Sequence, residues 1–238
     1  MSSGEPAGIL FDLDDTLIAY DAVAEDSWRT VCAGLFDDMS VSRDVLATIR
    51  RVRAWYWSDP DRHRAGRRDL QAARLKIVSF ALSEIGISVD NLASKIVDSY
   101  AVTRDRNVHL FPKAREALQF FVERQIPLVL VTNGTKKGQR AKIERFELEG
   151  YFDEILIEGE MGFGKPDPRV YKKALGFLGA LPSTVWSVGD NLEWDVFAPQ
   201  RLGKRGIWHD HASRGLPASS PEKPSRVINR VHELTFTE

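Results

Sequence analysis

Six short apolar runs, each bounded by turn residues, constrain the fold of this chain more than any other feature. They lie at residues 8–11, 127–131, 155–157, 185–188, 206–208 and 227–228. Short continuous apolar runs are typical of strands that are buried on both faces of a sheet. From residue 111 onward they alternate with helical patterns over roughly 113–125, 139–148, 169–178 and 194–202. This alternation predicts βαβ units, and therefore an α/β fold with a parallel sheet.

The stretch from residue 18 to residue 107 has a different pattern, with no convincing strand and about four amphipathic segments. Apolar residues recur there at the three-and-four spacing that helices use to pack into a small bundle. These positions are Val45, Ile49, Val52 and Tyr56, followed by Leu70, Ala73, Ile77 and Phe80. The sequence thus predicts a core formed by residues 1–17 and 108–238, with a helical domain over residues 18–107 inserted after the first strand.

Polar residues directly follow three of the predicted strands. Asp12 and Asp14 come after the first strand, Thr132 begins a Thr-Asn-Gly turn after the second, and Asp190 and Asp195 follow a later one. In open α/β sheets the carboxyl ends of the strands share one crevice, where ligands bind. We therefore expect these side chains to converge on a single pocket.

Composition limits the partners and the compartment. The 33 basic and 34 acidic side chains leave a formal net charge of −1, so no global field attracts nucleic acid or an anionic membrane. No apolar run approaches membrane-spanning length. The single cysteine, Cys32, cannot form an internal disulfide, and we expect it in the core. The first residues lack the features of a secretory signal. We expect a cytoplasmic protein; the sequence does not indicate its oligomeric state.

Four motifs together resemble the haloacid dehalogenase superfamily, over nearly the whole chain. They are FDLDDTL from Phe11, VTNG from Val131, GKPDP from Gly164 and VGDNLEWD from Val188, in the family's order. The helical insert is similar to the cap of its helical-capped phosphatases, subclass I. The resemblance implies a doubly wound, Rossmann-like core with a small all-helical cap inserted after the first strand.

The resemblance also implies covalent catalysis. Asp12 matches the nucleophile that forms an aspartyl-phosphate. Asp14 matches the acid/base residue, which protonates the leaving oxygen and then deprotonates the attacking water. Lys165 matches the cation that neutralises Asp12 and the transferring phosphoryl group.

The phosphate itself is implied to contact a second loop. Thr132 matches the residue that hydrogen-bonds the phosphate, together with Lys165. The N–H groups around Asn133 and Gly134 are expected to complete a cradle at the start of the following helix.

A magnesium ion is the implied cofactor. The resemblance places it between Asp12, the backbone carbonyl of Asp14, and Asp190, with Asp195 either a ligand or one layer further out. Such oxygen ligands are those that Mg²⁺ favours.

The predicted function is hydrolysis of a small phosphomonoester, of the nucleoside monophosphate or sugar phosphate type. A sugar-phosphate phosphomutase is the first alternative, because it also keeps Asp14. A 2-haloacid dehalogenase is disfavoured by Asp14, and an inactive scaffold by the presence of every matched polar residue. Fold-level resemblance does not choose the substrate.

Three other patterns in the sequence are interpreted as structural. A basic cluster in the insert predicts a solvated helix start, with substrate attraction as the alternative; it consists of Arg62, His63, Arg64, Arg67 and Arg68. For the run Trp55, Tyr56 and Trp57, stacking on a base or sugar is the functional alternative, and at least one ring is expected in the core of the insert. The run from His209 to His211 predicts an exposed loop rather than a metal site.

Overall fold

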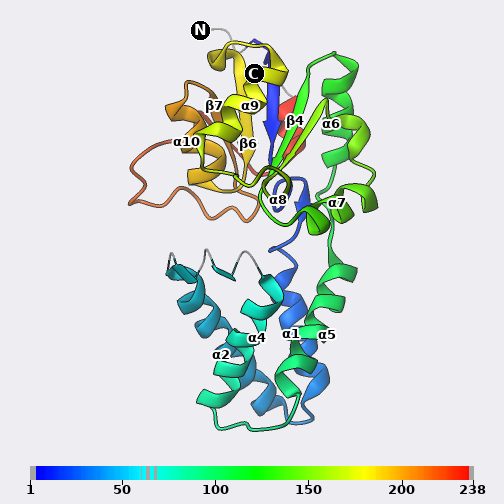
Figure 1. The fold of residues 1–238 in the computed structure, drawn as a ribbon, viewed down its shortest axis with the longest axis vertical. Coiled ribbons are helices and arrows are strands. Elements are labelled where there is room, and N and C mark those ends of the chain that lie inside the picture. The colour runs from blue at the N-terminus through cyan, green and yellow to red at the C-terminus, as the bar shows by residue number, and fades with distance from the viewer. Residues whose placement is uncertain (1–3, 60, 63–64, 67–68, 236–238) are drawn as a thin grey trace. The chain divides into compact units, whose positions relative to one another are not determined.

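The computed structural model describes residues 4–59, 61–62, 65–66 and 69–235 of the 238-residue chain. The chain divides into two compact units (Figure 1). The first consists of Met1–Ala19 and His109–Glu238 and contains the sheet, and the second is Tyr20–Val108 and is helical.

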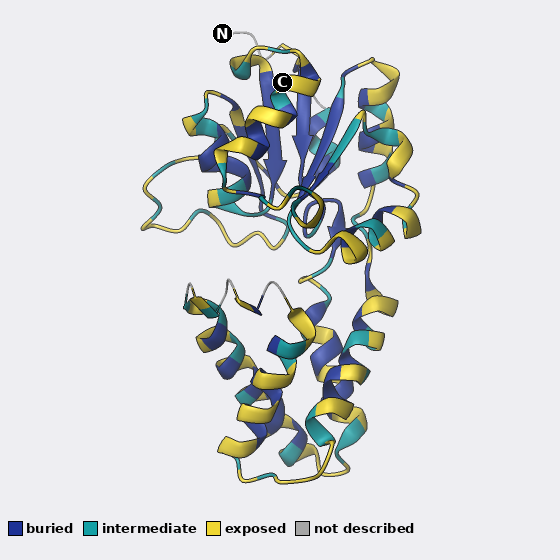
Figure 2. Ribbon diagram, viewed as in Figure 1, coloured by how far each residue is buried: buried dark blue, intermediate teal, exposed yellow. Residues whose placement is uncertain are grey.

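The first unit is built on a six-stranded sheet in the order β5-β4-β1-β6-β7-β8, with all neighbouring strands parallel. The strands are β1 (Gly8–Phe11), β4 (Leu128–Thr132), β5 (Glu154–Ile157), β6 (Val185–Gly189), β7 (Arg205–His209) and β8 (Arg226–Ile228). The central strands are buried along their whole length (Figure 2), as expected for apolar runs covered on both faces. The prediction of a parallel α/β fold is confirmed.

Helices cover both faces of this sheet. They are α6 (Ala114–Glu123), α7 (Lys136–Arg145), α8 (Glu158–Met161), α9 (Pro168–Leu178) and α10 (Ala198–Arg201), with 3₁₀ turns at Glu149–Tyr151, Pro182–Thr184 and Val231–Thr235 and a π-helical segment, η3, at Leu192–Phe197. Tyr171 of α9 packs with Leu10 and Val129 on one face. On the other, the ring of Phe121 of α6 lies 6.4 Å from that of Phe11.

Strand register brings the carboxyl ends of three central strands to one edge. Phe11, the last residue of β1, is level with Leu130 of β4 and Val188 of β6. The residues that follow each strand therefore begin at similar height on the same edge of the sheet, which is where parallel α/β sheets bind ligands.

A small antiparallel pair, β2 (Ile18–Ala19) and β3 (His109–Leu110), lies where the chain leaves the first unit and returns to it. The expectation that no strand lies between residues 18 and 107 is wrong for Ile18 and Ala19, because a two-residue strand is too short to produce a sequence period. The turn before β2 places Asp15 in the left-handed region, with φ of 58°.

The second unit packs four described helices, α1 (Ala24–Leu35), α2 (Met39–Ser58), α4 (Leu70–Glu84) and α5 (Leu92–Asn107), around its own apolar core. Six of the eight predicted core positions are buried, and Cys32 is also in this core. Leu70 and Phe80 are instead exposed, and Phe80 stacks on the exposed Trp55 with ring centroids 5.6 Å apart. Fewer of the apolar residues of α4 are therefore buried in the core than the spacing of its apolar residues predicted.

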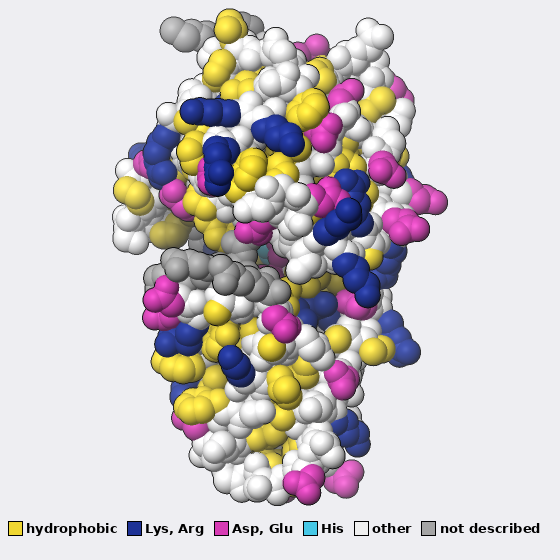
Figure 3. Space-filling view, in the orientation of Figure 1, with side chains coloured by type: hydrophobic (Ala, Val, Ile, Leu, Met, Phe, Trp, Pro, Cys, Tyr) yellow, Lys and Arg dark blue, Asp and Glu magenta, His cyan; other side chains and the backbone are white. Residues whose placement is uncertain are grey.

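Charged side chains of both signs are interspersed on the face shown in Figure 3. Of the predicted basic cluster, His63, Arg64, Arg67 and Arg68 lie outside the described residues, whereas the guanidinium of Arg62 lies 3.9 Å from the centre of the Trp55 ring. In the described part of the chain, no helix combines the length and the apolar character that crossing a membrane requires.

Candidate active site

Asp12 lies at the end of β1, between β4 and β6. Its N–H donates to the Val188 carbonyl at 3.0 Å, which continues the β1–β6 pairing by one residue. The Thr16 hydroxyl donates to Asp12 Oδ2 at 3.1 Å and accepts the N–H of Asp190, also at 3.1 Å. Thr16 is fully buried, so it fixes one oxygen of the Asp12 carboxylate and links it to the strand end that carries Asp190.

Lys165 holds the other oxygen of Asp12. Its Nζ atom lies 2.6 Å from Asp12 Oδ1 and 2.6 Å from Asp195 Oδ1. Burial opposes the charged form of this lysine, but the Asp12 and Asp195 carboxylates outweigh burial and hold its pKa above the ordinary value. Lys165 is therefore a fixed cation that joins two of the predicted site carboxylates.

Three carboxylates, those of Asp12, Asp190 and Asp195, form a compact cluster. One ligand oxygen from each lies within 4.8 Å of the others. Burial raises the pKa of Asp12, with Lys165 opposing the rise and Asp195 adding to it. Burial, together with the charges of Asp12 and Asp195, also raises the pKa of Asp190. When its three carboxylates are ionised, the cluster therefore carries more negative charge than the single ammonium of Lys165 compensates.

This uncompensated negative charge indicates whether the site could hold a metal ion. Buried carboxylates in excess of cations are stabilised by a divalent ion, and carboxylate oxygens are ligands that Mg²⁺ and Ca²⁺ prefer. The residues present therefore fit a hard divalent cation. Asp12 and Asp190 would bind this ion. The Asp195 carboxylate would lie between the ion and the Lys165 ammonium, and its negative charge would be shared by both.

Close packing places Asp195 in this cluster. Its Oδ2 accepts the N–H of Asn191 at 3.0 Å, and its own carbonyl accepts the Ser187 hydroxyl at 2.7 Å. A Cβ atom on Gly189 would lie 2.3 Å from the Asp195 carboxylate, closer than real Cβ contacts allow. Only glycine at the end of β6 admits the carboxylate.

Asp14 faces a different set of partners. Lys142 Nζ lies 2.7 Å from each of its carboxylate oxygens, and Gln139 Nε2 donates to Oδ2 at 3.0 Å. Gln139 and Lys142 are both on α7, and sequence reasoning missed them. Their only signal in the sequence is the spacing of three, which places them on one helix face shortly after the Thr-Asn-Gly turn.

The Thr-Asn-Gly turn lies beside Lys165, and its polar groups have structural partners. Asn133 Nδ2 donates to the Lys165 carbonyl at 2.7 Å, and the Lys165 N–H donates to Asn133 Oδ1 at 2.8 Å. The Gly134 N–H donates to Glu158 at 3.0 Å and would have to leave that carboxylate to bind a phosphate. Asn133 thus positions the backbone of Lys165.

The expectation of an exposed loop from His209 to His211 is wrong at its start. His209 ends β7 and is buried, with Nδ1 2.9 Å from the Asp15 carbonyl and the Phe111 ring packed edge-on at 5.1 Å. Burial lowers the pKa of His209 to about 4. Asp210 is also buried, and its carboxylate accepts the N–H groups of Arg214 and Gly215.

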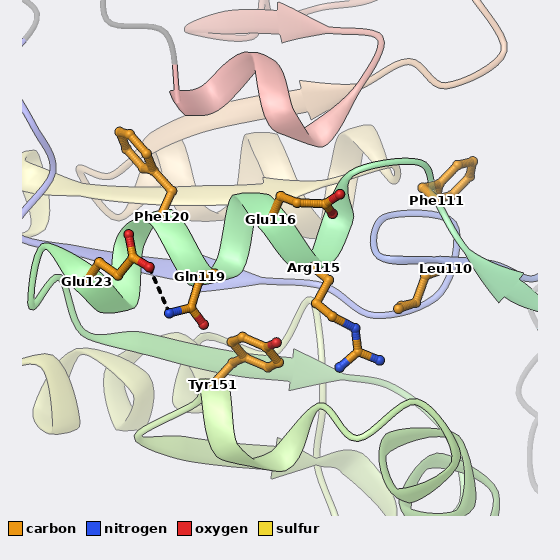
Figure 4. Close-up of a pocket in the computed structure, with 8 residues that line it drawn as sticks. All are labelled: Leu110, Phe111, Arg115, Glu116, Gln119, Phe120, Glu123 and Tyr151. Atoms are coloured by element: carbon orange, nitrogen blue, oxygen red, sulfur yellow. Dashed lines mark hydrogen bonds between the residues drawn. The ribbon is translucent and has the colours of Figure 1, made fainter.

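An open cavity of about 720 Å³ lies elsewhere on the first unit (Figure 4). Leu110, Phe111, Arg115, Glu116, Gln119, Phe120, Glu123 and Tyr151 line it, and the predicted site residues are not among them. Its polar groups have local partners: Gln119 donates to Glu123, and Arg115 donates to the Phe146 carbonyl. The carboxylate cluster is the better candidate for chemistry because its buried charges are concentrated and incompletely compensated.

Comparisons with known proteins agree with this geometry. The profile of the haloacid dehalogenase-like hydrolases matches residues 6–203. Phosphoserine phosphatase from Thermus thermophilus is 31% identical, over 97% of this chain and 98% of its own. Glyceraldehyde 3-phosphate phosphatase from Methanopyrus kandleri is 27% identical, over 95% of this chain and 97% of its own.

A solved structure shares the fold. The HAD-hydrolase YfnB from Bacillus subtilis, bound to magnesium, superposes with a TM-score of 0.72 and 19% identity, over 97% of both chains. The family profile spans most of the chain, and the Thermus thermophilus relative matches nearly its full length. This chain therefore belongs to the haloacid dehalogenase-like hydrolases.

Proposed function

We propose that this chain is a Mg²⁺-dependent phosphatase that hydrolyses a small phosphomonoester through an aspartyl-phosphate on Asp12. The observation that carries the proposal is the Asp12 carboxylate, held between Thr16 and Lys165 in a cluster that fits a divalent cation. A second carboxylate, Asp14, follows two residues later. The similar proteins support a small substrate, since two are named for phosphoserine and glyceraldehyde 3-phosphate.

In the first half of the reaction, an Asp12 oxygen attacks phosphorus as the bond to the leaving oxygen breaks. Asp14 gives its proton to that oxygen, so the product leaves as an alcohol. In the second half, a water molecule attacks the phosphorus of the aspartyl-phosphate and gives a proton to Asp14. The bond to Asp12 breaks, inorganic phosphate leaves, and both carboxylates return to their starting state.

Charge compensation is the main task of the surrounding residues. Lys165 neutralises Asp12 while a phosphate dianion approaches, and the buried Thr132 hydroxyl donates a hydrogen bond to a phosphate oxygen. Asn133 keeps Lys165 in place through its two hydrogen bonds to the Lys165 backbone. When bound at the cluster, Mg²⁺ supplies the positive charge that balances the carboxylates and the phosphate oxygens.

We assign the helical insert that the sequence predicts at residues 18–107, and whose compact unit is Tyr20–Val108, the role of a cap that favours small substrates over phosphoproteins. Dehalogenation is a less suitable function for the same nucleophile. That reaction needs neither an acid/base residue two positions after the nucleophile nor a metal ion, whereas this chain has Asp14 at that position and a carboxylate cluster that a cation would neutralise.

Phosphate release from a panel of small phosphomonoesters, measured with Mg²⁺ and with chelator, tests this function. Phosphoserine, glyceraldehyde 3-phosphate, nucleoside monophosphates and sugar phosphates belong in the panel, beside the Asp12→Asn variant. We expect Mg²⁺-dependent release from at least one compound and none from the variant. Release that continues undiminished in chelator, or in a correctly folded Asp12→Asn variant, would refute the proposal.

A further inference from the structure

We propose that Lys142 and Gln139 are positioning residues that hold the Asp14 carboxylate for its acid/base work. The inference rests on the proposed function, because it assigns Asp14 that work. It concerns α7, a helix to which the sequence motifs assign no catalytic part.

The contact between Lys142 and Asp14 joins residues 128 positions apart in the sequence. Both carboxylate oxygens lie 2.7 Å from the same Nζ atom, so the ammonium is centred on the carboxylate. The side chains are 17% and 25% exposed, which shields the pair from solvent more than an ordinary surface ion pair. Such a contact restricts the rotation of the Asp14 side chain more than a single hydrogen bond does.

Gln139 fixes the same carboxylate from the next turn of α7 and is itself buried. Its Nε2 atom lies 3.0 Å from Asp14 Oδ2, 2.5 Å from Thr132 Oγ1 and 2.9 Å from the Asn133 carbonyl. An amide nitrogen only donates, so its two N–H hydrogens are shared among the three oxygens and Thr132 accepts here. The hydroxyl hydrogen of Thr132 remains to be donated. One side chain thus ties the acid/base carboxylate to the residue that we assign to the phosphate.

The position of α7 brings both side chains to Asp14. The helix starts directly after the turn, where Thr135 caps it by accepting the Gly138 N–H at 3.2 Å. Gln139 and Lys142 follow at a spacing of three, so both face the carboxyl edge of the sheet. In contrast, Lys137 on the same helix is exposed, and it provides a matched control.

A double-mutant cycle in kcat tests the inference. The enzymes are wild type, Lys142→Met, Asp14→Asn and the double variant, assayed with an alkyl phosphate and with p-nitrophenyl phosphate. We expect Lys142→Met to lower kcat on the alkyl phosphate by about 10-fold or more, within the range of acid/base effects, with KM nearly unchanged. In the Asp14→Asn background the same substitution should change nothing further, because Lys142 acts through Asp14.

Leaving-group chemistry provides the second readout. Nitrophenolate leaves without a proton, so Lys142→Met should still release a first equivalent rapidly and then turn over slowly, as an enzyme that hydrolyses its intermediate poorly. Lys142→Arg should restore part of kcat, Gln139→Leu should reduce it in the same way as Lys142→Met, and Lys137→Met should match wild type.

Several results would overturn the inference. An equal loss from Lys142→Met in the wild-type and Asp14→Asn backgrounds would show that Lys142 acts on the phosphate or on the fold. A rise in KM alone would make it a phosphate ligand. Both outcomes presuppose an active wild type, whereas wild-type inactivity on every substrate would refute the proposed function and the inference with it.

Discussion

Replacement of Asp190 by asparagine should stabilise the metal-free protein and remove most of its response to Mg²⁺. Oxygens of Asp12, Asp190 and Asp195 lie within 4.8 Å of one another. Two unit charges at that separation repel by about 3.5 kcal/mol at an effective dielectric constant near 20. Lys165 offsets part of this repulsion, so we expect a net gain of about 1–3 kcal/mol for Asp190→Asn in chelator at pH 8.

The pH dependence gives the prediction its sign. Folding raises the pKa of Asp190 above its ordinary value of 3.8, so the folded state holds the proton more tightly than the unfolded state. Such a group favours folding below pH 3.8 and loses that contribution as the pH rises through the folded pKa. The advantage of Asp190→Asn should therefore be full in alkaline solution and shrink as the pH falls toward 4.

Thermal unfolding followed by fluorescence, in chelator and in a Mg²⁺ series, measures both effects. For the wild type, a ligand at 100 times its Kd adds about 2.7 kcal/mol, and the variant should lose most of that gain. Glu144→Gln, an exposed change on α7, should alter neither quantity. If metal-free wild type is at least as stable as Asp190→Asn at pH 8, or if Mg²⁺ stabilises both equally, the electrostatic account of the cluster is wrong.

Three further substitutions probe other parts of the structure. Lys204 is buried with no hydrogen-bond partner for Nζ among the described residues, and burial lowers its pKa to about 8. Lys204→Met should therefore raise the free energy of unfolding in urea by about 1–3 kcal/mol at pH 7, and this advantage should fade between pH 8 and 10.5. The exposed control, Lys173→Met, should leave the free energy of unfolding unchanged. A Cβ on Gly164 would lie 2.3 Å from Asn133 Oδ1, so Gly164→Ala should lower kcat at least about 10-fold in steady-state assays, and unchanged kcat would show that this contact is dispensable. Thr16→Val removes the hydroxyl that orients the nucleophile and should lower kcat about 10-fold with KM nearly constant; a rise in KM alone would contradict that role.

The sheet could be predicted from sequence because its strands are buried on both faces. Runs such as residues 185–188 are apolar throughout, and the structure places β6 at Val185–Gly189, one residue longer. The polar residues after these strands could be placed near one another for the same reason, since parallel strands end at one edge. Of the five residues so predicted, Asp12, Asp190 and Asp195 form one cluster, whereas Asp14 and Thr132 both contact Gln139.

Contacts between distant residues could not be predicted in this way. Gln139 and Lys142 lie in a polar helix whose sequence is typical of a solvated surface, and their partner Asp14 is more than 120 residues away. His209 was expected in an exposed loop because the polar residues Asp210 and His211 follow it, yet β7 extends far enough to bury it. Local pattern shows which residues are apolar, but only packing shows which polar residues become buried.

The covalent step on Asp12 is the central claim, and an acid-quenched reaction tests it most directly. Enzyme mixed with a substrate and Mg²⁺, quenched within its first turnovers and digested for mass spectrometry, should carry one phosphate on Asp12, in the peptide that contains FDLDDTL. The Asp12→Asn variant should carry none. Steady turnover with no phosphate on Asp12 at any quench time, including in the Asp14→Asn variant where the intermediate should persist, would contradict the account.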